Sequence, residues 1–226
     1  MTPPATRPGH TSLADRTAFI LEHTRLLPVP HVQEISIHVA DEATVVWQKT
    51  EEELGEIGLP PPFWAFAWAG GQGLARYVLD HPDLVRGKRV LDFAAGSGLV
   101  GIAAMKAGAS HVTSNDIDDY AHAAMMVNAQ ANDVALVIFI TDLIGQDHGW
   151  DVVLAGDIFY DQAIAERLVG WFDALHARGA DIILGDPGRA YLPKTGLKCL
   201  ATFAVPVTRD LEDAEIKNVG IYRLID

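Results

Sequence analysis

The sequence predicts an α/β fold in which helices cover both faces of a parallel sheet. Between residues 89 and 184, short apolar runs alternate with helical patterns, which is typical of βαβ units and therefore of parallel strands. Two further β-like runs, Cys199–Val207 and Gly220–Ile225, are joined by the acidic turn Asp210–Asp213 without a helical pattern. They predict an antiparallel hairpin that closes one edge of the sheet. The length of 226 residues suits one such domain with a small N-terminal extension.

The N-terminal extension is assigned to residues 1–59. Ser12 and Asp15 match a capping box ahead of apolar residues at helical spacing, which predicts a helix over 12–27 that Pro28 ends. The elements expected after it are β-like runs at Glu34–Val39 and Thr44–Trp47 and an acidic helical segment at Glu51–Glu56. The pattern leaves open whether this extension completes a substrate channel or only braces the fold.

The larger domain, residues 60–226, begins at three prolines and the aromatic stretch Phe63–Trp68. Its single cysteine, Cys199, has apolar neighbours, so we expect a buried thiol and neither an internal disulfide nor a cysteine-based metal site. The nine histidines show no metal-site spacing either, and no metal is predicted. Strands are expected at Arg89–Phe93, His111–Asp116, Val134–Ile140, Asp151–Gly156 and Ala180–Leu184, and helices at Leu99–Lys106, Tyr120–Ala131 and 162–177.

The formal charge of −13 limits the partners that the protein can attract. An acidic surface repels phosphate backbones, and the sequence has no cluster of lysine and arginine, so nucleic acid is not an expected partner. A basic protein or a small molecule fits this charge, and the alternative that acidity only keeps the protein soluble stays open. The first residues do not form a secretory signal, and the longest apolar run, Val134–Ile140, is too short for a membrane span. We therefore expect a cytoplasmic protein without membrane contact.

A glycine-rich loop follows the first strand of the alternating pattern. Gly96–Gly101 fits G-x-G-x-x-G, in which glycines let the backbone approach a nucleotide cofactor at a helix N-terminus. Asp92 stands four positions before this loop, at the end of the strand. A carboxylate there is unfavourable beside a pyrophosphate but favourable beside the ammonium of a methionine moiety. The loop therefore favours S-adenosylmethionine over NAD as the cofactor.

Acidic residues end the next two strands as well. Asp116 ends the second strand, where a carboxylate accepts hydrogen bonds from the ribose hydroxyls of either cofactor. Asp118 is a neighbour that can instead cap the next helix. Asp142 follows the third strand and can accept from an adenine amino group, with a helix-cap or loop role as the alternative.

The fourth strand leads into Asp157 and Tyr160, which lie three positions apart. At the carboxyl edge of a parallel sheet this position faces the reactive end of a bound cofactor, so the pair can flank one small acceptor group. The alternative is that Asp157 caps the following helix and Tyr160 only packs. The sequence Asn/Asp-Pro-Pro-Tyr/Phe is absent here, which argues against methylation of bases or side-chain amides.

Taken together, these motifs resemble the seven-β-strand methyltransferases, and within them the lysine methyltransferases that carry Asp-x-x-Tyr after strand four. The segments PPFWAFAWAGGQGLARYV, VLDFAAGSGLVGIAA, SNDID and DIFY, with Asn128 and Asn132, are most similar to the electron transfer flavoprotein β-subunit lysine methyltransferases. The resemblance covers roughly residues 60–225. It implies a Rossmann-like seven-stranded sheet, S-adenosylmethionine as the methyl donor and a protein lysine as the acceptor. The expected target is the flavoprotein β subunit, with a ribosomal protein as the alternative.

The resemblance also implies roles for individual residues. Trp68 would lie against the cofactor, and Asp157 and Tyr160 would line the lysine channel. Two positions depart from the family: Ala94 replaces a common glycine and is tolerable if its φ is negative, and Leu143 stands where relatives often place Trp beside the adenine. The full set of expected cofactor-binding residues is Trp68, Asp92, Ala94, Gly96, Gly98, Asn115, Asp116, Ile117 and Asp142.

The aromatic stretch fits this chemistry. Two of its four large side chains are expected in the core, and a partly exposed aromatic wall would attract an ammonium group and lower its pKa by desolvation. Free lysine has a pKa near 10.4, so one amine in ~2,500 is neutral at pH 7 and able to attack the methyl group. Asp157 would orient the amine and help it lose a proton, while Tyr160 positions it. An NAD-dependent oxidoreductase and a non-enzymatic nucleotide-binding module are the alternatives of other classes. The four aromatic side chains are Phe63, Trp64, Phe66 and Trp68.

Overall fold

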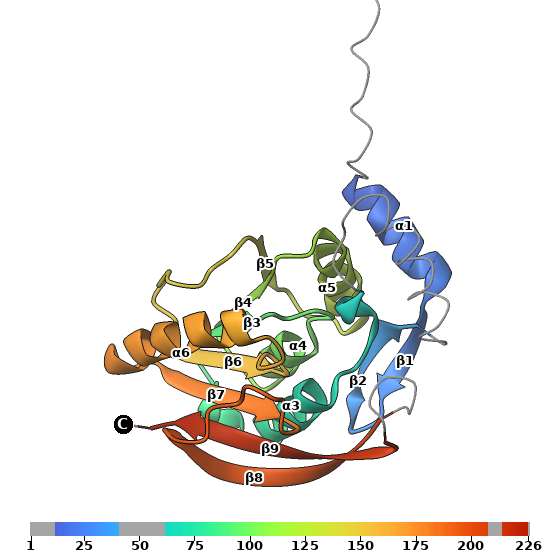
Figure 1. The fold of residues 1–226 in the computed structure, drawn as a ribbon. Helices are drawn as coiled ribbons and strands as arrows, with labels where there is room; N and C mark the ends of the chain where they lie inside the picture. The colour runs from blue at the N-terminus through green and yellow to red at the C-terminus, as the bar shows by residue number, and fades with distance from the viewer. Residues whose placement is uncertain (1–11, 41–61, 208–213, 226) are drawn as a thin grey trace, which may run out of the picture.

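Seven strands form the main sheet of the part of the chain that the computed structural model describes, residues 12–40, 62–207 and 214–225. Their order across the sheet is β5-β4-β3-β6-β7-β9-β8 (Figure 1). The first five strands of this order are parallel, and β9 pairs antiparallel with both β7 and β8. Their bounds are β3 Arg89–Phe93, β4 His111–Asp116, β5 Val137–Ile140, β6 Val152–Gly156, β7 Asp181–Asp186, β8 Leu197–Pro206 and β9 Ile216–Leu224.

Helices cover both faces of this sheet, as the alternating pattern predicts. Side chains of β3 alternate between the faces: Val90 packs into the core under α3 and α4, and Leu91 into the core under α6. The helix α5 packs beside α4 and leads away from the end of β4 (Figure 1). The α/β fold class and the closing antiparallel hairpin are thus confirmed, while the predicted hairpin turn at 210–213 lies outside the described residues. The helices are α3 Ala69–Asp80, α4 Leu99–Lys106, α5 Asp119–Ala131 and α6 Gln162–Ala177.

The helix α3 was not expected from the sequence. Its first half carries glycines at 70, 71 and 73, which normally disfavour a helix. In the structure α3 crosses the sheet so closely that a Cβ on Gly70 would lie 2.2 Å from the carbonyl oxygen of Gly185, and one on Gly73 would lie 2.7 Å from Val219. Close packing against the sheet therefore explains Gly70 and Gly73, two of the glycines that concealed this helix.

The N-terminal part differs from its prediction in one respect. The helix α1, Leu13–His23, has the expected capping box between Ser12 and Asp15, but it ends before residue 27. The following residues form the strand β1, Arg25–Val29, which pairs antiparallel with β2, Val32–Val39. The predicted extension of the helix to 27 is wrong because apolar residues there take part in this hairpin instead. The predicted run at 34–39 lies within β2, whereas the runs at 44–47 and 51–56 and the boundary at 59 fall outside the described residues.

The prediction of a buried Cys199 is also wrong, since its side chain is exposed. It belongs to β8, the outermost strand of the sheet, which has a strand neighbour on one side only. Most side chains along β8 are partly or fully exposed, so apolar composition does not imply burial there. None of the helices in the described ranges is long and apolar enough to cross a membrane.

Candidate active site

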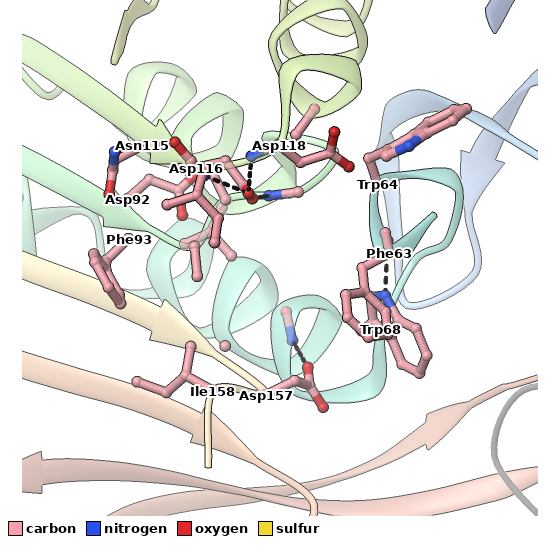
Figure 2. Close-up of a pocket in the computed structure, with 18 of the residues that line it drawn as sticks. Phe63, Trp64, Trp68, Asp92, Phe93, Asn115, Asp116, Asp118, Asp157 and Ile158 are labelled. Carbon is pink, nitrogen blue, oxygen red and sulfur yellow. Dashed lines mark hydrogen bonds between the residues drawn. The ribbon is translucent and has the colours of Figure 1, made fainter. Parts of the chain in front are cut away.

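A cavity of about 450 Å³ opens at the carboxyl ends of β3, β4 and β6. This edge of a parallel sheet is where ligands bind in open α/β folds. Ten of the eleven residues predicted from the sequence line it, so the structure brings together segments that are far apart in the chain (Figure 2). The exception is Gly98, which caps α4 and packs against Met125. The predicted residues in the wall are Trp68, Asp92, Ala94, Gly96, Asn115, Asp116, Ile117, Asp142, Asp157 and Tyr160.

The loop between β3 and α4 is held in a turn that needs left-handed backbone conformations. Gly96 has a φ of 50° and Gly98 a φ of 79°, which glycine adopts without a steric cost because it has no Cβ. Ala94 also has a positive φ, of 52°, so the condition of a negative φ, under which alanine would be tolerable at this position, is not met. Several loop amides are already used within the protein, since Gly96 N donates to Asp116 at 2.8 Å and Gly98 N to Ala95 O at 2.8 Å.

Asp92 lies buried behind this loop. Its Oδ2 accepts hydrogen bonds from Gly101 N at 2.8 Å and from the Ser114 hydroxyl at 3.5 Å. Burial raises the pKa of Asp92 to about 7, and the nearby charge of Asp116 acts in the same direction. Because burial disfavours the ionised form of this carboxyl, a positive group placed beside it would stabilise the carboxylate strongly.

Asp116 connects the loop to the end of β4. Its Oδ2 accepts from Gly96 N, and its Oδ1 accepts from Ile117 N at 2.7 Å and Asp118 N at 3.1 Å (Figure 2). Burial raises the pKa of Asp116, while these three hydrogen bonds lower it. Asp118 caps α5 by accepting from Tyr120 N, which is the neighbouring role that the sequence analysis considered for it. Ile117 is exposed at the rim of the cavity.

Asn115 lines the cavity but also has a structural task. Its Nδ2 donates to Phe139 O and to Thr141 O, both at 2.9 Å. It therefore fixes the end of β5 against β4, so that the residues after β5 reach the cavity wall.

Asp142 follows β5 and combines the two roles considered for it. It lines the cavity, its Oδ1 accepts from Ile144 N at 2.9 Å, and its Oδ2 forms an ion pair with Arg167 at 2.5 Å. Leu143, where relatives often carry Trp, points instead into the core beside Trp150. Besides Asp142, this turn presents Ile144 to the cavity.

The aromatic stretch divides as expected between core and cavity. Trp64 and Phe66 are buried and pack with α5, which confirms that two of the four belong to the core. Phe63 and Trp68 are half-buried in the cavity wall, and Trp68 Nε1 donates to Phe63 O at 2.8 Å (Figure 2). Tyr160 completes this wall, with its ring 5.6 Å from that of Phe63.

Asp157 lies at the end of β6, across the cavity from Asp116 (Figure 2). Its backbone is left-handed, with φ of 59°, and its Oδ2 accepts from Gly71 N at 2.9 Å, near the start of α3. It does not cap α6, because Asp161 takes that role by accepting from Ile164 N. Burial raises the pKa of Asp157 to about 6, although its hydrogen-bond partners lower it.

Arg189 is a cavity residue that the sequence analysis did not identify. It follows β7, and its guanidinium forms an ion pair with Asp157 Oδ1 at 2.7 Å while lying 5.6 Å from the centre of the Trp68 ring. One signal was available: Asp186-Pro187-Gly188-Arg189 directly follows a predicted parallel strand, whose end meets the same sheet edge as the other site residues.

The chain is similar to known methyltransferases. A family model described as ribosomal protein L11 methyltransferase (PrmA) matches residues 77–183. The electron transfer flavoprotein beta subunit lysine methyltransferase of Xenopus laevis is 38% identical over 187 residues, covering 81% of this chain and 75% of that protein. The protein of the same name from Danio rerio is 35% identical over 213 residues, covering 91% and 81%.

Among solved structures, a putative RNA methyltransferase from Pyrococcus horikoshii shares the fold. Its TM-score is 0.53 at 17% identity, covering 69% of this chain and 83% of that one. The two vertebrate relatives match most of both chains. The chain therefore belongs to the family of the electron transfer flavoprotein beta subunit lysine methyltransferases.

Proposed function

We propose that the protein transfers a methyl group from S-adenosylmethionine to a lysine side chain of the electron transfer flavoprotein β subunit. Family membership supports a lysine as acceptor and S-adenosylmethionine as donor. The observation in the structure that carries the proposal is the pairing of the Asp157 carboxylate with the aromatic wall of Trp68 and Tyr160 at one end of the cavity. A carboxylate beside aromatic faces is a favourable environment for a lysine amine.

The chemistry of the cavity fits S-adenosylmethionine better than a dinucleotide. The cofactor carries an ammonium and a sulfonium, both positive, and the wall offers the carboxylates of Asp92, which is buried, and of Asp116, which is half-buried. A pyrophosphate would instead be repelled by these carboxylates, and it would need loop amides such as Gly96 N, which already donates to Asp116. The carboxylates in the wall and the occupied loop amide therefore argue against the oxidoreductase alternative.

We assign the cofactor's parts to the wall residues as follows. Asp92 would hold the methionine ammonium, Asp116 the ribose hydroxyls, and the turn at Asp142 the adenine, with Trp68 against the cofactor. Ala94, Gly96 and Gly98 shape the loop between them, and Asn115 and Ile117 complete the wall at the end of β4.

The protein's own residues prepare the acceptor. When bound, the cofactor supplies an electrophilic methyl group on its sulfonium. Trp68, Phe63 and Tyr160 exclude water from the lysine side chain, which lowers the pKa of its ammonium. Asp157 orients the lysine nitrogen and accepts the proton that leaves it, since this carboxyl is mostly ionised at neutral pH.

The direct test uses labelled S-adenosylmethionine with purified flavoprotein β subunit, followed by mass spectrometry of the product. We expect label on lysine. Asp116→Ala should abolish binding of S-adenosylhomocysteine, whereas Asp157→Ala should retain binding and lose turnover. Label in nucleic acid, or tight NADH binding without S-adenosylhomocysteine binding, would overturn the proposal. Equal loss of binding in the two variants would contradict the division of roles.

A ribosomal protein is the second candidate target. The match of residues 77–183 to the ribosomal protein L11 methyltransferase model favours it, and basic ribosomal proteins suit a charge of −13. Offering the β subunit and ribosomal proteins together, in equal amounts, would rank the two targets by the initial rate of labelling. The cytoplasmic location expected from the sequence stays a prediction, which fractionation of cells with an antibody to the protein would test.

A further inference from the structure

We propose that Arg189 is a positioning residue for methyl transfer, which holds the Asp157 carboxylate in a fixed, ionised state facing the acceptor lysine. This inference rests on the proposed function of the cavity. It concerns a residue that is paired with the Asp157 carboxylate at the cavity wall. The argument begins with how Arg189 itself is held.

The backbone of Arg189 is fixed by the end of β7. Asp186, which is buried, accepts hydrogen bonds at Oδ1 from both Gly188 N and Arg189 N, each at 2.7 Å. This turn directs the Arg189 side chain into the cavity wall. The guanidinium therefore starts from a rigid strand end at the same sheet edge as Asp157, not from a long loop.

The guanidinium then holds one oxygen of Asp157 from two positions. Its NH2 group donates to Oδ1 at 2.7 Å and its Nε donates to the same oxygen at 3.3 Å. The other oxygen, Oδ2, accepts from Gly71 N at 2.9 Å. Both oxygens of Asp157 are thus fixed by donors from different elements, which sets the direction in which the remaining lone pairs point.

Trp68 supports the guanidinium from a third side. The centre of its ring lies 5.6 Å from Arg189 Cζ, within the range of a cation–π interaction. Because Trp68 also lines the cavity, Arg189 joins the carboxylate and the aromatic wall into one unit.

The charges around Asp157 make this pairing necessary. The Asp157 side chain is only 10% exposed, and burial is the strongest influence raising its pKa. Asp186 from β7 also raises the pKa of Asp157, whereas Arg189 and the Gly71 N–H of α3 lower it; Tyr160 and Asp161 follow on its own turn. Arg189 is therefore the cation that opposes burial, and a neutral residue in its place would raise the pKa of Asp157 further.

A lysine beside an unpaired carboxylate would be stabilised as its charged, unreactive form. The pairing with Arg189 balances the carboxylate, so an entering ammonium meets a nearly neutral group and loses its proton more easily. Arg189 thereby serves both the ionisation of Asp157 and the deprotonation of the acceptor.

The test compares the pH dependence of kcat in the wild type, Arg189→Met and Arg189→Lys. The acidic limb of the wild type should reflect Asp157, with activity falling as the pH drops through about 6. In Arg189→Met the acidic limb should move to a pH higher by about one unit or more, with S-adenosylhomocysteine binding retained. In Arg189→Lys the limb should return most of the way to its wild-type position. Arg167→Met is the matched control, because Arg167 lines the same cavity but pairs with Asp142, and its limb should stay in place.

Two kinetic results would overturn the inference. An unmoved acidic limb in Arg189→Met, with a lower KM for the protein substrate, would mean that Arg189 only occupies the acceptor's place until the lysine displaces it. An equal shift in Arg167→Met would mean that any cavity cation has the same effect. If Arg189→Met does not fold, Arg189→Gln provides the same neutral replacement.

A second measurement needs no methyl transfer. NMR titration of aspartate side-chain carbons, with the Asp157 signal assigned by Asp157→Asn, should show a higher pKa for Asp157 in Arg189→Met than in the wild type. An unchanged titration overturns the role of Arg189 alone. A wild type that methylates no lysine overturns the proposed function, so the two failures are distinguishable.

Discussion

Protonation of the Asp92 carboxyl should be directly coupled to binding of the cofactor. Its buried carboxyl has a pKa raised to about 7, because burial disfavours the charged form. A bound ammonium would favour the ionised form and lower this pKa, so binding should release a proton below pH 7. The affinity for S-adenosylhomocysteine should therefore rise with pH up to about 7 and then level off.

Isothermal titration in buffers of different ionisation enthalpy would measure this proton release. Asp92→Asn is the matched variant, since an amide oxygen can still accept from Gly101 N but carries no charge. We expect this variant to bind about tenfold more weakly at neutral pH, with little pH dependence left. An unchanged pH dependence in Asp92→Asn would show that another carboxyl, such as Asp118, is responsible.

Ala94 stores backbone strain in the cofactor loop. Its φ of 52° costs an alanine about 1–2 kcal/mol relative to glycine, whereas glycine loses about 0.5–1 kcal/mol through the flexibility of the unfolded chain. Ala94→Gly should thus raise the free energy of unfolding by about 0.5–1 kcal/mol in urea denaturation. Ala95→Gly is the control in the same loop, where φ is not positive, and it should lower stability. Loss of stability in both variants would contradict the strain at Ala94.

At the scale of elements, α5 connects the N-terminal hairpin to the cofactor loop. Asn128 is fully buried: its Oδ1 accepts from His38 N in β2 at 2.7 Å, and its Nδ2 donates to Ser97 O in the loop at 2.8 Å. Asn132, one turn later, also holds β2 through Ser36 N and O, and its other side-chain hydrogen bond in the described part of the chain goes to Asn128 O and not to the loop. Both asparagines thus brace the hairpin, but only Asn128 also supports the cofactor loop, so variants of the two residues distinguish these roles.

This difference gives a prediction about residues before 60. Asn128→Ala should weaken binding of S-adenosylhomocysteine by about tenfold, since it removes a buried hydrogen bond worth roughly 1–3 kcal/mol from the loop. Asn132→Ala should reduce thermal stability by a similar amount yet keep the affinity within about twofold. An equal loss of affinity in both variants would contradict this separation of roles, because bracing of the hairpin would then affect cofactor binding as much as the bond to the loop does.

Sequence patterns predicted well those strands whose residues are mostly buried inside the sheet. Strands β3, β4 and β6 are buried along most of their length and bounded by turns, and their positions could be predicted within one residue. The helix α3 and the strand β1 could not. Glycines in α3 serve a close contact with β7 and β9, and β1 becomes a strand only through its pairing with β2. Both depend on partners distant in the chain.

The candidate site shows the same division at the scale of the whole molecule. Asp92, Asp116 and Asp157 follow predicted strands of a parallel sheet, and such strand ends meet at one edge, so their convergence could be predicted. The ion pair between Asp157 and Arg189 could not, because it depends on how a turn after β7 directs one side chain across β6. The positive φ of Ala94 likewise follows from the shape of the folded loop.

The charge of the whole molecule leads to a test of how the substrate is found. A net charge of −13 produces a field that extends over the Debye length, about 30 Å at 0.01 M salt but only about 8 Å at 0.15 M. If this field attracts a basic region around the acceptor lysine, added salt should slow association of the protein substrate. The KM for the protein substrate should then rise several-fold between these salt concentrations, while kcat stays constant.

The control is the cofactor product, which binds through short contacts inside the cavity. Its affinity, measured in the same salt series, should change by less than about twofold, because buried interactions are screened weakly. A KM that is independent of salt would mean that the acidic surface serves solubility and that recognition depends on contacts at the cavity rim. A parallel loss of cofactor affinity would instead indicate that salt weakens the fold around Asp92 and Asp116. If the KM rises with salt while the cofactor affinity stays constant, the net charge of the molecule serves to attract its protein substrate.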